Sequence, residues 1–170
     1  MTERGPLRVV LIEDNPSAAM MVESMLAENG NRDFNCTWCS TLASGLEAIV
    51  STGTGAVAVL LDLGLAGSDG MKALDAVVRN CPHAAVVVLT GFDDSAAGEL
   101  AVRGGAQDYL VKGKVDTALL SRALRYAVER KFLQDEVAAM EDELEEGKAR
   151  LADIIDIAFE GLVIIDEPRT

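Results

Sequence analysis

The 170-residue sequence contains little cysteine or histidine and no long apolar run. Its three cysteines are an odd number and do not make the set of a disulfide-stapled domain. No run approaches the roughly 20 apolar residues that a membrane helix needs, so we expect no membrane contact. The first six residues lack the basic and then apolar pattern of a secretion signal. We therefore expect a cytoplasmic protein.

Cys36 and Cys39 have the C-x-x-C spacing that redox and zinc sites use. No second Cys/His pair completes a zinc set, because His83 is the only histidine. On a strand, the two thiols would also point to opposite faces of the sheet. We predict free thiols, buried or half-buried, in place of a redox or metal site.

Acidic residues outnumber basic ones by 28 to 15, which gives a net charge of −13. Such a chain repels phosphate backbones, so we expect no direct nucleic acid partner; cations and basic partner surfaces are favoured. Apolar residues make up 49% of the sequence, which is enough for the core of one domain of ordinary size with chain to spare.

Five apolar segments of strand length alternate with helical patterns. The third and fourth segments are apolar almost throughout, which indicates strands buried on both faces, as in a parallel sheet covered by helices. This alternation predicts a doubly wound α/β fold with a five-stranded parallel sheet. The expected strands cover residues 7–12, 33–39, 56–62, 84–90 and 107–112. The expected helices between them cover residues 16–29, 41–50, 69–80 and 94–103, with Asn15 capping the first.

Polar side chains stand where four of the expected strands end. Glu13 and Asp14 follow the first strand, Asp62 ends the third, Thr90 ends the fourth and Lys112 ends the fifth. Because right-handed crossovers bring the carboxyl ends of parallel strands to one edge, we expect these groups to meet there.

Three carboxylates at one edge repel one another unless a cation lies among them, and Mg²⁺ with its oxygen ligands is the natural candidate. A hydroxyl and an ammonium beside such a centre make a place for a phosphoryl group, with a carboxylate as the in-line nucleophile. A structural ion-pair cluster would account for one or two of these residues. It does not account for five polar groups at the ends of four strands.

From about residue 7 to residue 130, the sequence resembles the receiver domain of two-component response regulators. Five motifs carry the resemblance, in the family's order and on the expected elements. They are Leu11-Ile12-Glu13-Asp14-Asn15, Leu60-Leu61-Asp62-Leu63, Ser68-Asp69-Gly70, Leu89-Thr90-Gly91 and Gly105-Ala106-Gln107-Asp108-Tyr109-Leu110-Val111-Lys112. The resemblance implies the flavodoxin-like strand order 2-1-3-4-5.

The resemblance also implies a set of site residues. Asp62 would accept a phosphoryl group from the phosphohistidine of a sensor histidine kinase or phosphotransfer protein. Glu13, Asp14 and Asp62, with the backbone carbonyl of Gly64, would hold Mg²⁺. Self-dephosphorylation would be the only enzymatic activity.

Further positions match the family's phosphoryl contacts and switch. Thr90 and Lys112 would contact the phosphoryl oxygens, and Tyr109 would be the aromatic that swings inward when Thr90 moves toward the phosphate. The alternative for Tyr109 is a half-buried strand aromatic without such a role.

The sequence departs from the family pattern at two positions. Gly113 follows the lysine where the family often has a proline in a cis peptide, so we expect the glycine to supply an unusual backbone angle instead. Glu13 stands where many members have Asp, and its longer side chain would reach the metal through water. Neither departure removes a required group.

Residues from 114 to about 159 form one long helical pattern. Apolar positions alternate at heptad spacing from Tyr126, interrupted at Arg130 and Gly147, which favours a two-stranded parallel coiled coil and hence a homodimer. The alternative is one solvated helix that packs on its own receiver.

Residues 151–166 resemble the opening of a PAS sensory domain, with a short helix, a glycine turn and a strand at 162–165.

We therefore divide the chain into an N-terminal tail (1–6), a receiver domain (7–130), a helical coiled-coil linker (131–150) and the start of a truncated PAS-like domain (151–170), as in a fragment of a larger protein. The receiver would relay its change through the helix to an output module. A phosphorylation-independent pseudo-receiver that scaffolds a dimer is the alternative. A phosphatase of the aspartyl-phosphate kind is set aside, because Gly64 stands where its second acid/base Asp is required.

Overall fold

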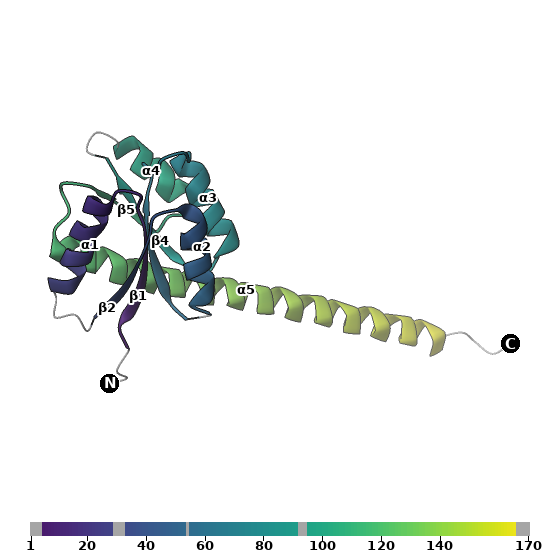
Figure 1. Cartoon of the computed structure of the whole chain (residues 1–170). Helices are drawn as coiled ribbons and strands as arrows, with labels where there is room; N and C mark the ends of the chain where they lie inside the picture. The colour runs from purple at the N-terminus through teal and green to yellow at the C-terminus, as the bar shows by residue number, and fades with distance from the viewer. Residues whose placement is uncertain (1–4, 29–32, 54, 92–94, 166–170) are drawn as a thin grey trace. The chain divides into compact units, whose positions relative to one another are not determined.

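The computed structural model describes residues 5–28, 33–53, 55–91 and 95–165, the last five by their backbone alone. Strands and helices alternate strictly along these residues (Figure 1). The strands are β1 (Leu7–Ile12), β2 (Phe34–Cys39), β3 (Val57–Asp62), β4 (Ala85–Thr90) and β5 (Asp108–Val111). The helices are α1 (Pro16–Glu28), α2 (Leu42–Ser51), α3 (Gly70–Asn80), α4 (Ser95–Arg103) and α5 (Thr117–Ile165).

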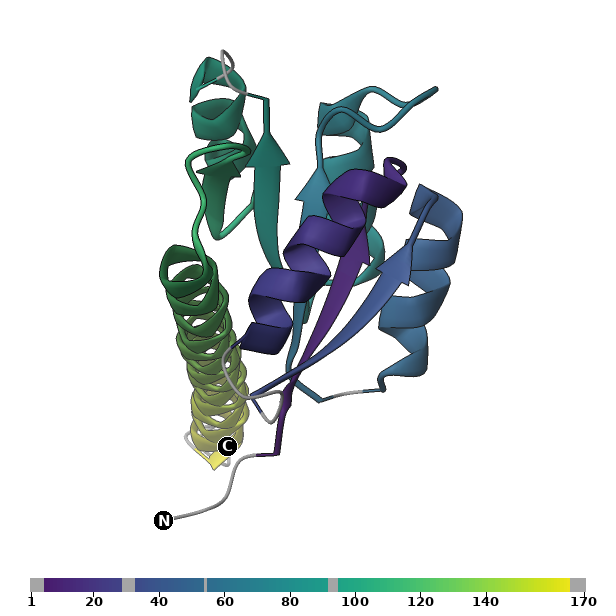
Figure 2. The ribbon, with the colours of Figure 1, turned by 60° about the vertical axis from the view of Figure 1, so that its left-hand side comes forward.

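All strand pairs are parallel, and the sheet has the order β2-β1-β3-β4-β5, as predicted. Figure 2 shows the strand arrows pointing to the same edge. In the register, Ile12 of β1 lies opposite Leu61 of β3, and Asp62 lies opposite Leu89 of β4. The side chains that follow β1 and β3 are therefore neighbours at the carboxyl edge.

Helices cover both faces of the sheet. One core cluster joins the sheet to α2, α3 and α4, and the other joins it to α1 and the beginning of α5. Strands β3 and β4 are buried at every position. This confirms the prediction from their apolar runs, since a strand between two helical layers has no face in water.

Short polar side chains cap the first three helices. Asn15 Oδ1 accepts the backbone N–H groups of Ser17 and Ala18 at 2.9 and 3.3 Å, which confirms the predicted cap. Thr41 and Asp69 cap α2 and α3 in the same way. The stop that we expected at residues 29–30 and the start at residue 94 lie outside the described residues.

The cysteines of β2 are free thiols, as predicted. Cys39 belongs to the core cluster on one face of the sheet, and Cys36 packs against the cluster on the other. Burial, with smaller contributions from the charges of Glu23 and Cys39, raises the pKa of the Cys36 thiol to about 12. The thiol is therefore protonated at neutral pH and a poor nucleophile or metal ligand.

Helix α5 begins three residues later than the pattern predicted. The Asp116 side chain accepts the Leu119 N–H at 2.7 Å, so it caps the helix there, while Lys114 N–H donates to the Val111 carbonyl in a turn. The sequence pattern missed this because Lys114 and Val115 fit a helix as well as a turn.

Three polar contacts tie the beginning of α5 to the rest of the domain. Thr117 Oγ1 donates to Glu28 Oε2 of α1 at 2.7 Å. Arg125 Nη2 lies 2.6 Å from Asp33 Oδ2, just before β2, and its guanidinium stands 5.2 Å from the centre of the Phe34 ring. These two contacts lie eight positions apart on the helix, and five positions further on Arg130 Nη1 donates to the Gln107 carbonyl at 2.8 Å.

The chain divides into two units, Met1–Phe132 and Leu133–Thr170, and α5 contributes residues to both. The predicted glycine turn and strand at residues 162–165 were wrong, because α5 continues to Ile165. A strand without a neighbour leaves its backbone groups unpaired, whereas a helix pairs them within the segment. No helix among the described residues is both long and apolar enough to cross a membrane.

Candidate phosphoryl and metal site

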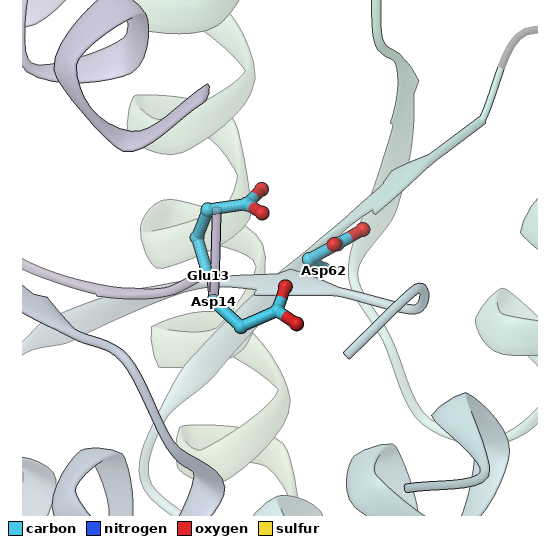
Figure 3. Close-up of side chains that lie close together, drawn as sticks. All are labelled: Glu13, Asp14 and Asp62. Atoms are coloured by element: carbon cyan, nitrogen blue, oxygen red, sulfur yellow. The ribbon is translucent and has the colours of Figure 1, made fainter. Parts of the chain in front are cut away.

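Three carboxylates meet at the carboxyl edge of the sheet. Glu13 and Asp14 follow β1, and Asp62 is the last residue of the neighbouring β3 (Figure 3). One oxygen from each carboxylate lies within 4.8 Å of the others. Glu13 is fully buried and Asp62 is 4% exposed, so water screens their repulsion poorly. The cluster therefore favours a cation, and its oxygen ligands suit Mg²⁺.

The ammonium of Lys112 lies against two of the carboxylates. Its Nζ is 2.6 Å from Glu13 Oε2 and 2.9 Å from Asp62 Oδ2. Burial by itself lowers the pKa of Lys112, but the hydrogen bonds and charges of Glu13 and Asp62 outweigh burial and raise the pKa above its ordinary value. Lys112 is therefore a fixed positive charge at neutral pH.

Backbone amides of the loop after β3 orient two of the carboxylates. Ala66 N–H donates to Asp14 Oδ2 at 2.9 Å, and Gly64 N–H donates to Asp62 Oδ1 at 3.1 Å. The sequence analysis missed the Ala66 contact, because a backbone donor leaves no signal in the side-chain pattern.

Thr90 ends β4 beside this cluster, since its neighbour Leu89 lies opposite Asp62. Its side chain is 2% exposed, and Oγ1 has no hydrogen-bond partner within the described part of the chain. A buried hydroxyl without a partner costs roughly 1–3 kcal/mol. Such a group at a charged edge is typical of a binding site whose ligand supplies the partner.

Tyr109 of β5 is half-buried and packs against the core cluster under α2, α3 and α4. Its ring lies directly against Gly98 in α4, where a Cβ would overlap the ring and come within 2.7 Å of Cε2. No feature of the sequence pattern connects Gly98 with Tyr109. The contact depends on how α4 packs over β5.

The turn after Lys112 uses glycine as predicted. Gly113 has a φ of +84°, a left-handed angle that side chains rarely adopt, and the described residues contain no cis peptide bond. The bend that the family often makes with proline is thus made by glycine.

Trp38 is a further residue at the site that the sequence analysis did not identify. Its indole Nε1 donates to the Glu13 backbone carbonyl at 2.8 Å. Leu11 lies opposite Trp38 in the register, so the indole stands at the end of β2 next to the loop that carries the acidic pair. Placing Trp38 at the site requires the pairing of β2 with β1, and residues 33–39 had the weakest strand pattern of the five segments.

The family model of the response regulator receiver domain matches residues 9–125. The chain belongs to this family. Receiver domains bind Mg²⁺ at an acidic pocket, and the described residues of this chain contain an acidic cluster of Glu13, Asp14 and Asp62. The fold class, strand order and family expected from the sequence are therefore confirmed.

Curated relatives of this receiver are longer proteins. The photosynthetic apparatus regulatory protein RegA of Rhodobacter capsulatus is 33% identical over 124 residues, which are 71% of this chain and 65% of RegA. The nitrate/nitrite response regulator protein NarP of Escherichia coli is 28% identical over 136 residues, 74% of this chain and 56% of NarP. The chain thus spans less than two thirds of these relatives.

Solved structures show the same fold. A response regulator receiver domain protein from Clostridium thermocellum is 27% identical, with a TM-score of 0.63 over 75% of this chain and 98% of that chain. NtrX from Brucella abortus has a TM-score of 0.67 at 24% identity, over 79% of this chain and 29% of NtrX. The second likeness concerns the fold alone.

Proposed function

We propose that Asp62 accepts a phosphoryl group from the phosphohistidine of a sensor histidine kinase or phosphotransfer protein. The proposal rests on the place of Asp62, beside a lysine ammonium, two other carboxylates and a buried hydroxyl without a partner. An Asp62 oxygen bonds to phosphorus while the P–N bond to the histidine ring breaks, and the ring nitrogen keeps the electron pair and takes up a proton.

The surrounding residues stabilise the charge that moves with the phosphoryl group. Glu13, Asp14 and Asp62, with the Gly64 carbonyl, would hold Mg²⁺, which when bound neutralises charge on the phosphoryl oxygens. The Lys112 ammonium pairs with another phosphoryl oxygen, and the Thr90 hydroxyl, which makes no hydrogen bond among the described residues, donates one to the phosphoryl group. Water later hydrolyses the acyl phosphate in slow self-dephosphorylation.

The test is intact-mass spectrometry after incubation with Mg²⁺ and acetyl phosphate. A single phosphoryl adduct on the wild-type chain, absent from Asp62→Asn, supports the proposal. Asp75→Asn is the matched control, because Asp75 is an exposed carboxylate paired with Arg79 and should leave the adduct intact. No adduct on the wild-type chain, with several donors and with Mg²⁺ binding demonstrated, would favour the pseudo-receiver scaffold instead.

For the second unit, we propose that a second copy of α5 covers an exposed apolar stripe to form a two-stranded coiled coil. Each side chain of the stripe is more than half exposed, an unusual state for large apolar groups in water. The stripe consists of Leu133, Val137, Met140, Leu144, Leu151 and Ile154. A hollow of about 500 Å³ at Gly147 lies along it.

The charges beside the stripe fit a weak parallel dimer. Glu143 and Lys148 are five positions apart, the spacing at which flanking residues of two parallel helices pair, so they attract across the interface. Glu136 and Glu141 have the same spacing and repel. Because these pairs offset each other, apolar burial would supply the net stability, and the dimer would depend on protein concentration.

Sedimentation of the full chain over a range of concentrations tests the dimer. We expect a monomer–dimer equilibrium that Leu144→Lys shifts to monomer, whereas Ala149→Lys, outside the stripe, leaves it unchanged. A wild-type chain that stays monomeric at all concentrations would contradict the dimer and leave the Asp62 proposal untouched.

We further propose that phosphorylation is relayed through α5 to an output module. Thr90 turns toward the phosphoryl group, Tyr109 moves inward, and the surface that carries α5 repacks. Spin-label distances between the receiver and α5 should change with acetyl phosphate in the wild-type chain but not in Asp62→Asn. Equal distances in both states would exclude this relay.

A further inference from the structure

The loop after β3 contains a tight turn of four residues. Ser68 N–H donates to the Leu65 carbonyl at 3.2 Å, and Gly67 has a φ of +75°. This hydrogen bond, together with a positive φ at the third residue, is the pattern of a type II turn. Ala66 is the second residue, a position where proline is common, because its fixed φ fits and the turn itself does not use the N–H there.

The turn presents the Ala66 N–H to the acidic cluster. This N–H donates to Asp14 Oδ2 at 2.9 Å, across 52 positions of sequence. On one side of it, Leu65 is 5% exposed and belongs to the core cluster under α2, α3 and α4. On the other side, Asp69 caps α3. The donor is therefore held from both ends of the turn, while the Ala66 residue itself is exposed.

Asp14 has few other contacts that orient it. The paired part of β1 ends at Ile12. The backbone is fixed once more at Glu13, whose N–H donates to the Cys39 carbonyl at 3.1 Å. Asp14 is the next residue and is half-buried, and among the described residues its carboxylate accepts one hydrogen bond, from Ala66. Without that bond, the side chain could turn toward water.

We infer that the backbone N–H of Ala66 is a positioning donor, which aims the Asp14 carboxylate at the cation site and so raises the affinity for Mg²⁺. A hydrogen bond to a charged carboxylate is about twice as strong as one between neutral groups. Outer partners of this kind fix the orientation of metal ligands, and losing one typically costs about 10–100-fold in metal affinity. The inference deepens the proposed function and rests on its assignment of Asp14 to the metal site.

Proline at position 66 removes the donor and suits the turn. Ala66→Pro lacks the N–H but fits the second position of a type II turn, whereas the conservative variant Ala66→Ser keeps the N–H. The Mg²⁺ affinity of each chain is measured by NMR titration of metal-free protein, without phosphodonor. We expect Ala66→Pro to bind Mg²⁺ about tenfold more weakly than the wild-type chain, and Ala66→Ser to bind as the wild type does. Equal or tighter binding by Ala66→Pro, or the same loss in Ala66→Ser, would overturn the inference.

Hydrogen exchange of the Ala66 amide tests the contact without a substitution at position 66. Because Ala66 is exposed, its bond to Asp14 is what protects the N–H. In metal-free protein, exchange measured by NMR should be several-fold slower in the wild-type chain than in Asp14→Ala. The Gly64 N–H, which donates to Asp62 Oδ1 in the same loop, is the internal control and should exchange alike in both proteins. Equal exchange of the Ala66 amide in the two proteins would refute the contact.

Addition of Mg²⁺ to the wild-type chain distinguishes positioning from competition. A donor that positions Asp14 keeps its bond in the metal-bound protein, so the Ala66 amide should stay protected when Mg²⁺ is added. If the protection disappears, the cation and the amide compete for the same carboxylate, and the inference fails.

These measurements omit phosphotransfer. A failure of acetyl phosphate to modify Asp62 would therefore leave the Ala66 donor standing. Conversely, failure of the donor would leave Asp62 as the proposed acceptor.

Discussion

Adding one methyl group at Gly98 tests how closely α4 packs against Tyr109. It lies in the interior of α4, where glycine costs about 1 kcal/mol relative to alanine. In an ordinary helix, Gly98→Ala would therefore stabilise the protein by about 1 kcal/mol. Here the new methyl group would overlap the Tyr109 ring, so the ring must shift or α4 must move.

Overpacking of a well-packed site typically costs about 1–3 kcal/mol. Set against the helix gain of about 1 kcal/mol, Gly98→Ala should leave the domain between neutral and about 2 kcal/mol less stable. In a Tyr109→Ala background there is no ring to displace, and the same change should stabilise by about 1 kcal/mol. The expected coupling energy of the two positions is therefore about 1–3 kcal/mol.

Urea unfolding of the four proteins of this cycle, followed by Trp38 fluorescence, measures the coupling. Purification in EDTA keeps metal binding out of the comparison. If Gly98→Ala stabilises by the same amount in both backgrounds, the Tyr109 ring does not rest on Gly98, and the reasoning fails. A coupling of the expected size would make Gly98→Ala a tool for displacing Tyr109 without touching the acidic cluster.

Three further substitutions test other parts of the structure. Because folding raises the pKa of the Cys36 thiol to about 12, from 9.0, the chain should lose stability as pH rises from about 9 toward 12. Urea unfolding at pH 8 and pH 10.5 measures this loss, and the free energy of unfolding should fall less in Cys36→Val than in the wild-type chain. Equal losses in the two proteins would contradict the burial of the thiol. Gly113→Ala forces a side chain into a φ of +84° and should destabilise by about 1 kcal/mol, whereas a stabilising effect would mean that the turn is not left-handed. A Cβ at position 147 would meet no atom within 4 Å, so Gly147→Ala should stabilise α5 by about 1 kcal/mol. In thermal unfolding, the circular dichroism signal at 222 nm should then be lost at a higher temperature, while the transition seen by Trp38 fluorescence stays unchanged. Equal shifts in both signals would show that the two units unfold together.

The sequence predicted the fold well because the apolar runs have one consistent explanation. A run such as residues 84–90 can be buried at all positions only between two layers, and that requires a parallel sheet with helices on both faces. The positions of Asp62, Thr90 and Lys112 followed from the same topology, since each ends or follows a strand. Backbone topology is thus enough to bring these residues to one edge.

The remaining features depend on side-chain geometry that no pattern of residue types encodes. The difference between Glu13 and Asp14 rests on which oxygen meets Lys112 and which meets Ala66. The contact between Gly98 and Tyr109 rests on the packing of a helix over a strand. At residues 162–165, the apolar run suited strand or helix, and among the described residues this segment is the end of α5.

Three polar contacts limit the motions by which α5 can carry a signal. Thr117 and Arg125 are eight residues apart, which is about 12 Å along a helix axis, and they bind Glu28 and Asp33 respectively. Five residues further on, Arg130 Nη1 donates to the Gln107 carbonyl at 2.8 Å in a partly buried contact. Rotation of the helix about its axis would have to break all three contacts, whereas a tilt could keep the contact nearest the pivot. The exposed Arg125–Asp33 ion pair is the contact that salt screens, so higher ionic strength would weaken it first.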